Sequence, residues 1–153
     1  MSALPEWGAN HYAGRLPRGR WLAWNKLGDF PPFGDSFSDV EFGWTNQKGA
    51  SRIFSLLWKG VRQGEKYDNG RRYHPSQKPL GLMVWLLEQA GAPAGSEVLD
   101  PYCGSGSTGV AALLTGRSFV GVECEPAYLD IAARRLGDAE HDGVQLGMFG
   151  GAT

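Results

Sequence analysis

Cysteine, histidine and long apolar runs are all scarce in this chain. Its 153 residues include two cysteines and three histidines. Cys103 and Cys124 show neither a disulfide framework nor paired metal-ligand spacing, so we expect small packing residues and predict no metal site. No run approaches the length of a membrane span, and the first residues lack the basic start and apolar stretch of a signal peptide. These absences predict a cytoplasmic protein that does not enter a membrane.

Length and composition predict one globular unit. With 42% hydrophobic residues, the chain can bury one ordinary core and is too short for two full domains. We expect a single domain over residues 1–136. The segment 137–153 is polar and rich in glycine, and we expect it to be a flexible tail.

The formal net charge of −1 hides an asymmetry along the chain. Residues 1–96 carry 12 Lys and Arg against 8 Asp and Glu, whereas residues 97–153 carry 3 against 8. The basic excess is concentrated between residues 59 and 78, which suits a loop that faces phosphates. A solvated run of charges is the alternative interpretation. The basic residues of this stretch are Lys59, Arg62, Lys66, Arg71, Arg72 and Lys78.

The first 70 residues are typical of short strands separated by turns rich in Gly, Pro, Asp and Asn. The expected strands are RWLAWNK (20–26), VEFGWT (40–45) and RIFSLLWKG (52–60). A loop over residues 64–74 follows. Lys78-Pro79 then opens a helix whose apolar residues recur at helical spacing until Gly91 ends it.

From residue 96 the pattern changes to strand, glycine loop, helix, strand and helix. We expect strands at 96–100 and 118–123 and helices at 107–116 and 126–136. This β-α-β-α succession predicts an α/β fold with a parallel sheet covered by helices. Right-handed crossover would bring the loop after Leu99 to the same carboxyl edge of the sheet as Glu123, where such folds bind ligands.

The loop before the first of these helices has the spacing G-x-G-x-x-G, at Gly104, Gly106 and Gly109. Together with an acidic residue at the next strand end, Glu123, this spacing is typical of nucleotide-binding crossovers, in which the acid accepts hydrogen bonds from the ribose. Spacing alone admits a nicotinamide cofactor or S-adenosylmethionine, and a packing turn without a ligand is a further alternative. Asp100 favours S-adenosylmethionine, because a carboxylate at the strand tip repels a pyrophosphate and attracts the ammonium of a methionine moiety.

These motifs resemble a known family. The stretches DPYCGSGSTG (100–109) and FVGVECEPAYLDIAARRL (119–136) resemble the cofactor-binding region of DNA amino-methyltransferases acting on adenine N6 or cytosine N4. HPSQKPLGLMVWLLE (74–88) resembles the motif that precedes the cofactor loop in the permuted β-type members. Residues 6–60 resemble the segment that phage-type adenine methyltransferases place after their catalytic motif. The resemblance covers nearly the whole chain and implies a three-layer, Rossmann-like, S-adenosylmethionine-dependent methyltransferase fold.

The resemblance also implies which residues hold the cofactor. Glu123 would bind the ribose. A wall beside the methionine end would be formed by His74, Ser76, Gln77, Lys78 and Pro79. A floor would be formed by Asp100, Pro101, Cys103, Gly104, Ser105 and Gly106. For the segment 74–79, a polar lead-in that caps a helix is the alternative.

The family's catalytic motif, which is Asp, Asn or Ser followed by Pro-Pro and an aromatic residue, is not found. The sole Pro-Pro is Pro31-Pro32, and Phe30 before it cannot accept a hydrogen bond from a target amine. This pair also follows the strand 20–26, so a proline turn explains it better. We therefore expect no catalytic residue here and a fold truncated at its amino-terminal side. The sheet would lack a strand beside the cofactor strand, and a second chain or a homo-oligomer would complete it.

By this resemblance the function is methyl transfer from S-adenosylmethionine to DNA, with adenine N6 favoured over cytosine N4. We expect the single chain to be incomplete and inactive. A catalytically silent cofactor- or DNA-binding remnant is the main alternative. A nicotinamide-dependent oxidoreductase would account for neither Asp100 nor the HPSQKP segment.

Three groups of residues are candidates for contacts with partners. For DNA, these are the stretch Lys59, Arg62, Lys66, Arg71 and Arg72 and the cluster Arg15, Arg18 and Arg20. The interleaved Trp21, Trp24, Trp44 and Trp58 are better interpreted as core. The segment Gln145–Phe149 resembles the short peptide by which bacterial replication proteins hold the sliding clamp, although an unstructured or edge-strand tail is the better interpretation.

Overall fold

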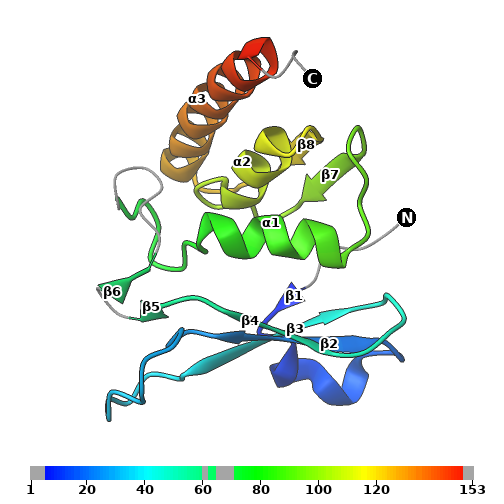
Figure 1. Cartoon of the computed structure of the whole chain (residues 1–153), viewed down its shortest axis with the longest axis vertical. Helices are drawn as coiled ribbons and strands as arrows, with labels where there is room; N and C mark the ends of the chain where they lie inside the picture. Colours follow the sequence, from blue (N-terminus) through cyan, green and yellow to red (C-terminus); the bar gives the residue numbers. More distant parts are fainter. Residues whose placement is uncertain (1–5, 60–61, 65–70, 150–153) are drawn as a thin grey trace. The chain divides into compact units, whose positions relative to one another are not determined.

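The computed structural model describes residues 6–59, 62–64 and 71–149, and the side chains of 7–59, 62–64 and 71–141. Its contacts divide the chain into two compact units. Unit 1 comprises residues 1–70 and 85–91, and unit 2 comprises residues 71–84 and 92–153. Figure 1 shows the elements of both units, coloured along the chain.

Unit 1 is built on a four-stranded sheet in the order β1-β3-β2-β4. Strands β1 and β2 run antiparallel to β3, and β4 runs parallel to β2. The predicted strands 20–26 and 40–45 are confirmed, and the third is divided between β4 and β5. The bounds are β1 (Glu6–Trp7), the 3-10 helix η1 (Ala9–Arg15), β2 (Arg20–Asn25), β3 (Val40–Thr45), β4 (Arg52–Ser55), β5 (Trp58–Lys59) and β6 (Arg62–Gln63).

Alternate residues of β2 form the core of unit 1. Leu22 and Trp24 are 0% and 1% exposed. The ring of Trp7 meets Trp24 edge-on, with centroids 6.1 Å apart. Trp58 is also buried, so the interpretation of Trp24 and Trp58 as core residues is confirmed. Trp21 and Trp44 are half-buried and face each other across β2 and β3.

Unit 2 has the predicted succession of strand, helix, strand and helix. Its strands β7 (Glu97–Asp100) and β8 (Ser118–Gly121) pair in parallel, with Asp100 opposite Gly121. Helix α2 (Ser107–Leu114) packs on both strands and on α3 (Pro126–Phe149). Helix α1 (Leu80–Gln89) begins after Pro79 as predicted, and Gly91 follows its end with a φ of +65°.

Helix α3 is longer than the sequence pattern indicated. It continues through Phe149, whereas we expected a tail from Gly137. Ala139 is fully buried, so this part of the helix packs against the rest of unit 2. The glycines of residues 137–149 suggested a tail, but this stretch contains no proline, and its Ala, Glu, Gln, Leu and Met residues favour a helix. None of the described helices is both long and apolar enough to cross a membrane.

Candidate ligand-binding site

The loop between β7 and α2 depends on three glycines, each for a physical reason. Gly104 and Gly106 have φ angles of +52° and +80°, in the left-handed region that side chains disfavour. A Cβ atom on Gly106 would also lie 3.1 Å from the Cβ of Ala132 on α3. A Cβ on Gly109 would lie 2.5 Å from the ring of Phe119. The first two glycines therefore shape the turn, and the third lets α2 approach the sheet closely.

Asp100 ends β7 with both carboxylate oxygens already hydrogen-bonded. Oδ1 accepts from the backbone N–H of Tyr102 at 3.0 Å, and Oδ2 accepts from the hydroxyl of Thr108 at 2.7 Å. A carboxylate has about four lone-pair positions, so each oxygen can accept one more hydrogen bond. The strand tip thus presents a half-buried carboxylate in a fixed orientation.

Glu123 closes the loop from the other strand. Its Oε2 accepts from the N–H of Gly104 at 2.8 Å, and its Oε1 accepts from the N–H of Glu125 at 2.9 Å. The hydrogen bond from Glu125, with help from that of Gly104, lowers the pKa of the Glu123 carboxyl below its ordinary value. The prediction that the loop and Glu123 meet at one sheet edge is confirmed.

The segment His74–Pro79 packs against this loop. Gln77 is 8% exposed, and its Oε1 accepts from the N–H of Tyr73 at 2.7 Å and from the hydroxyl of Ser105 at 3.5 Å. The ring of His74 lies 3.8 Å from the position of a Cβ on Gly104 and meets the ring of Tyr128 at a centroid distance of 4.3 Å. The segment 74–79 and the loop 100–106, predicted as the wall and the floor of one cofactor site, are therefore in contact.

The other predicted residues differ in their surroundings. Pro79 is fully buried and Lys78 is half-buried, whereas Ser76 and Pro101 are exposed. Cys103 is 8% exposed, and burial raises the pKa of its thiol. Thr108 and Tyr128 were missed by the sequence reasoning. The position of each could have been inferred, because Thr108 is the second residue of α2 and Tyr128 is the third residue of α3.

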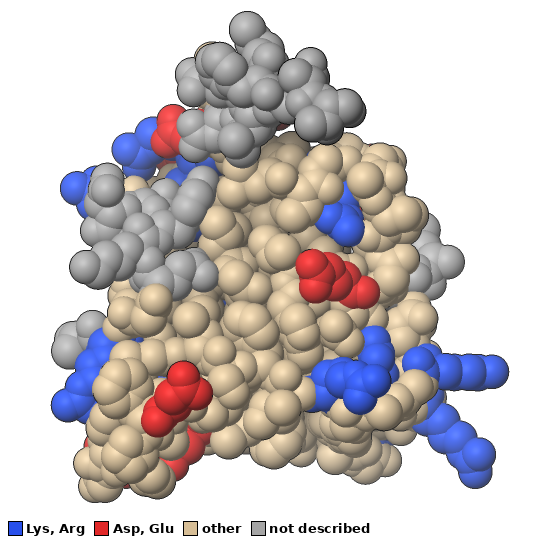
Figure 2. All heavy atoms as spheres, in the orientation of Figure 1, with Lys and Arg blue, Asp and Glu red and all other residues tan. Residues whose placement is uncertain are grey.

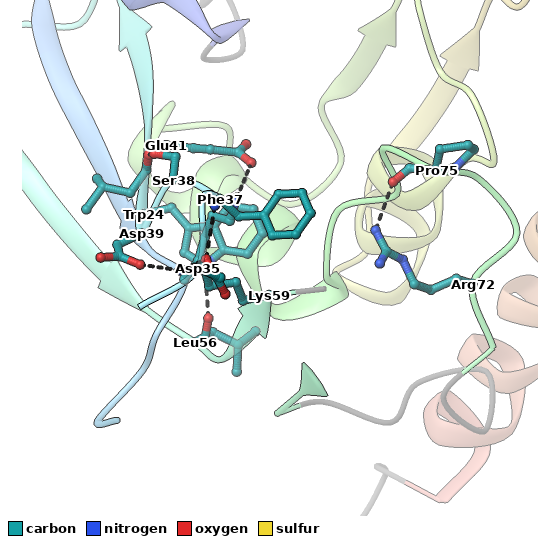
Figure 3. Close-up of polar contacts among 12 residues, drawn as sticks. Trp24, Asp35, Phe37, Ser38, Asp39, Glu41, Leu56, Lys59, Arg72 and Pro75 are labelled. Carbon is teal, nitrogen blue, oxygen red and sulfur yellow. Dashed lines mark hydrogen bonds and ion pairs between the residues drawn. The ribbon is translucent and has the colours of Figure 1, made fainter. Parts of the chain in front are cut away.

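The basic residues proposed for DNA contact do not share one environment. Lys59 is 4% exposed and forms ion pairs with Asp35, at 2.8 Å, and with Asp39 (Figure 3). These pairs raise the pKa of Lys59, mainly through the hydrogen bond with Asp35. Arg62 is exposed, and its guanidinium lies 4.1 Å from the ring centre of Phe33. Lys59 is therefore a poor candidate for a phosphate contact, although it lies in the predicted stretch.

Among the remaining basic candidates, Arg15 and Arg18 are exposed, whereas Arg20 is half-buried and its guanidinium donates to the carbonyls of Ala50 and Gln89. Arg71 and Arg72 are exposed, and Arg72 donates to the carbonyl of Pro75 at 2.8 Å (Figure 3). Lys66 lies outside the described residues. In the lower part of Figure 2, over unit 1, basic side chains lie on both sides of the face shown, with acidic ones beside the left-hand group. On this face, basic residues do not form one continuous patch.

The Pro31-Pro32 pair lies in the loop between β2 and β3. Phe30 before it is 56% exposed, and the loop has no regular secondary structure at the two prolines. The pair therefore connects two strands, as expected, although neither proline itself lies in a turn.

Comparison with known proteins agrees with the geometry of this site. The family model of DNA methylase matches residues 16–134, which is most of the chain. The chain belongs to this family. The resemblance drawn from its motifs is therefore confirmed.

Individual relatives match parts of this chain at moderate identity. The type II methyltransferase M2.DpnII of Streptococcus pneumoniae is 46% identical over 86 residues, 56% of this chain. The type II methyltransferase M.HinfI of Haemophilus influenzae is 35% identical over 92 residues, 60% of this chain. The DNA adenine methyltransferase YhdJ of Escherichia coli (strain K12) is 39% identical over 77 residues, 50% of this chain. The matches span 31%, 25% and 24% of these relatives.

Solved structures extend the likeness to the fold. The M1.HpyAVI–SAM complex matches 76% of this chain and 60% of its own, with a TM-score of 0.52 and 31% identity. The cytosine-N4-specific PvuII DNA methyltransferase matches 82% of this chain and 57% of its own, with a TM-score of 0.54 and 16% identity. The Rossmann-like α/β methyltransferase fold expected from the sequence is confirmed.

Proposed function

We propose that this chain carries the S-adenosylmethionine-binding part of a DNA adenine methyltransferase. The observation that carries the proposal is the pair of oriented carboxylates, Asp100 and Glu123, on one glycine loop at one edge of a parallel sheet. Gly104 and Gly106 hold the loop in left-handed conformations that side chains disfavour. The ligand of the M1.HpyAVI complex supports the choice of cofactor.

The residues of the site fit the chemistry of this cofactor. Oε2 of Glu123 has a lone pair left for one ribose hydroxyl, and Oε1 can accept from the other in place of the weak Cys124 thiol donor at 3.5 Å. Asp100 has lone pairs left for the ammonium of the methionine moiety. The segment His74–Pro79 would line the methionine end, since Gln77 and His74 already contact the loop. S-adenosylmethionine supplies an activated methyl group on a sulfonium. The chain's own residues bind and orient it, which is the part of catalysis due to proximity.

The substrate that we propose is an adenine amino group in DNA. The name of the relative YhdJ supports adenine, as does the resemblance of residues 6–60 to phage-type adenine methyltransferases. A base must leave the helix stack to reach such a site. For the DNA phosphates, the exposed Arg15, Arg18, Arg62, Arg71 and Arg72 are the candidates.

We further propose that these 153 residues transfer no methyl group by themselves. The family's catalytic Pro-Pro motif is absent from them, and among the described strands β7 pairs with β8 alone. A strand supplied by a second chain or a second copy would pair with the open edge of β7 and complete the site. A catalytically silent remnant is the second candidate function, and the same missing motif favours it.

Two minor proposals concern location and a further partner. We place the protein in the cytoplasm, where its DNA substrate would lie. The peptide Gln145–Phe149 is a candidate ligand of a sliding clamp. Its side chains lie outside the described residues, so the proposal rests on the sequence alone.

The cofactor proposal is tested by calorimetric titration of the chain with S-adenosylhomocysteine. Wild type should bind, while Asp100→Asn and Glu123→Gln should each weaken binding about tenfold or more, since each removes a charge-assisted hydrogen bond. Glu97→Gln is the matched control, because this exposed carboxylate begins the same strand as Asp100. Unchanged affinity in both site variants would reject the proposed pocket.

A methyl-transfer assay distinguishes an incomplete methyltransferase from the second candidate function, a catalytically silent remnant. Wild-type chain with labelled S-adenosylmethionine and adenine-rich duplex DNA should transfer no label. Transfer by the purified chain would refute the proposed dependence on a second polypeptide. If label transfer appears when a fragment that carries the Pro-Pro motif is added, a remnant is excluded.

A further inference from the structure

A buried arginine lies directly behind the glycine loop. Arg135 of α3 is 4% exposed. Its Nη1 donates to the carbonyl oxygen of Ser105, and it lies 3.4 Å from the hydroxyl oxygens of Ser105 and Ser107. One guanidinium nitrogen therefore reaches the residues on both sides of Gly106.

Burying a guanidinium costs free energy unless its N–H donors are hydrogen-bonded, and the oxygens of Ser105 and Ser107 provide such acceptors for Arg135. Gly106 is left-handed and caps α2 without any side-chain hydrogen bond. Its backbone N–H donates to the carbonyl of Cys103 at 2.8 Å. Ala132, one turn before Arg135 on α3, packs against Gly106. Helix α3 thus packs the methyl group of Ala132 against the turn and hydrogen-bonds to it through the guanidinium of Arg135.

Ser105 connects these contacts to the segment His74–Pro79. The hydroxyl of Ser105, which faces Arg135, also lies 3.5 Å from Oε1 of Gln77. Gln77 Oε1 accepts in turn from the backbone N–H of Tyr73. The guanidinium carbon of Arg135 lies 5.5 Å from the ring centre of Tyr73. Arg135 therefore contacts the glycine loop directly and the neighbouring segment through an aromatic ring.

We propose that Arg135 is a positioning residue for the ligand site. It orients the carbonyl and hydroxyl of Ser105, and through them it holds the glycine loop and Gln77 in one arrangement. Arg135 does not itself touch the ligand, since it lies behind the loop and is buried. The role rests on the proposed function, because it matters for affinity only if the loop binds S-adenosylmethionine.

The test compares two replacements of similar length. Arg135→Met keeps most of the packing and removes every donor, whereas Arg135→Lys keeps a charge and a donor but loses the planar fork. Affinity for S-adenosylhomocysteine should fall about ten- to hundredfold in Arg135→Met, with a smaller loss in Arg135→Lys. Arg134→Ala is the control, because Arg134 is exposed and, among the described residues, donates to the carbonyl of Asp130 in its own helix, at 3.4 Å. Its affinity should match wild type.

If the role of Arg135 were purely structural, Arg135→Lys and Arg135→Met would lose the same affinity for S-adenosylhomocysteine. Equal affinity in Arg135→Lys and Arg135→Met, or wild-type affinity in both, overturns the proposal. If Arg135→Met does not fold by circular dichroism, the coupling between Arg135→Lys and Ser105→Ala decides. Non-additive losses in that pair support the contact, and additive losses overturn it.

Hydrogen exchange of the ligand-free chain separates this proposal from the function it rests on. The amides of Cys103, Gly104 and Gly106 donate within the fold and should be protected in wild type. Their exchange should accelerate about tenfold or more in Arg135→Lys and stay unchanged in Arg134→Ala. If wild type binds no S-adenosylhomocysteine while this difference is observed, the cofactor proposal fails and the positioning contact stands. Unchanged exchange in Arg135→Lys rejects the contact.

Discussion

Gly109→Ala should destabilise the protein although alanine favours a helix. The new Cβ would lie 2.5 Å from Cδ1 and Cε1 of Phe119 and 2.6 Å from Cδ2 of Leu136, where ordinary contact is 3.4–4 Å. Helix α2 would therefore have to move by about 1 Å from β8 and α3, both of which it contacts. Overpacking of this kind costs about 1–3 kcal/mol, and the helix preference of alanine returns up to about 1 kcal/mol. A net loss of about 1–2 kcal/mol follows.

Gly137→Ala is the matched control. Gly137 also lies within a helix, but a Cβ there would meet none of the described atoms within 4 Å outside the neighbouring backbone of its own helix. This variant should be more stable than wild type by about 0.5–1 kcal/mol. Urea unfolding followed by circular dichroism measures both changes, provided that the m-values agree. Equal or greater stability of Gly109→Ala relative to wild type would refute the account of the third glycine as the close-packing position.

Three further predictions concern ionisable side chains. Because hydrogen bonds lower the folded pKa of Glu123 below its ordinary value of 4.5, its contribution to stability is complete above that value and is lost as the pH falls through the lowered pKa. The difference in unfolding free energy between wild type and Glu123→Gln should then stay constant from pH 8 to about 5 and shrink at lower pH. A steady decline of this difference from pH 8 downward would contradict the prediction. With a disulfide-exchange reagent at pH 8, exposed Cys124 should react quickly and buried Cys103 only after denaturation, because burial raises its pKa; two equally fast thiols would count against the burial. The double variant Asp35→Asn/Asp39→Asn should lower the urea midpoint more than Lys59→Met does, because the double variant leaves the buried ammonium of Lys59 without its ion pairs. A larger drop in Lys59→Met would show that Lys59 is not held by these carboxylates.

Local pattern was enough to predict the part of the site that is close in sequence. The alternation and glycine spacing between residues 96 and 136 located β7, α2 and β8, because each such element has a strong period of its own. The separate roles of Gly104 and Gly109 came only from the structure. The meeting of Glu123 with the loop followed from the topology of a parallel crossover.

Features that depend on distant contacts could not be predicted in this way. Lys59 seemed one of several loop cations, but its partner Asp35 lies in the loop between β2 and β3, 24 positions earlier. Arg135 was not singled out from the sequence, because its burial depends on the loop that it contacts, 28 to 30 positions earlier. The sequence pattern also gave helix α3 too short an extent, because the glycines of 137–149 were weighed above the helix-favouring residues between them.

A crystal structure of the chain with S-adenosylhomocysteine tests the central claim most directly. The account predicts the ribose hydroxyls within hydrogen-bond distance of Glu123 and the amino group of the homocysteine moiety beside Asp100. It also predicts Gly104 and Gly106 under the ligand, in the conformations described here. A ligand bound elsewhere on the chain, or one whose carboxylate lies against Asp100, would contradict the account.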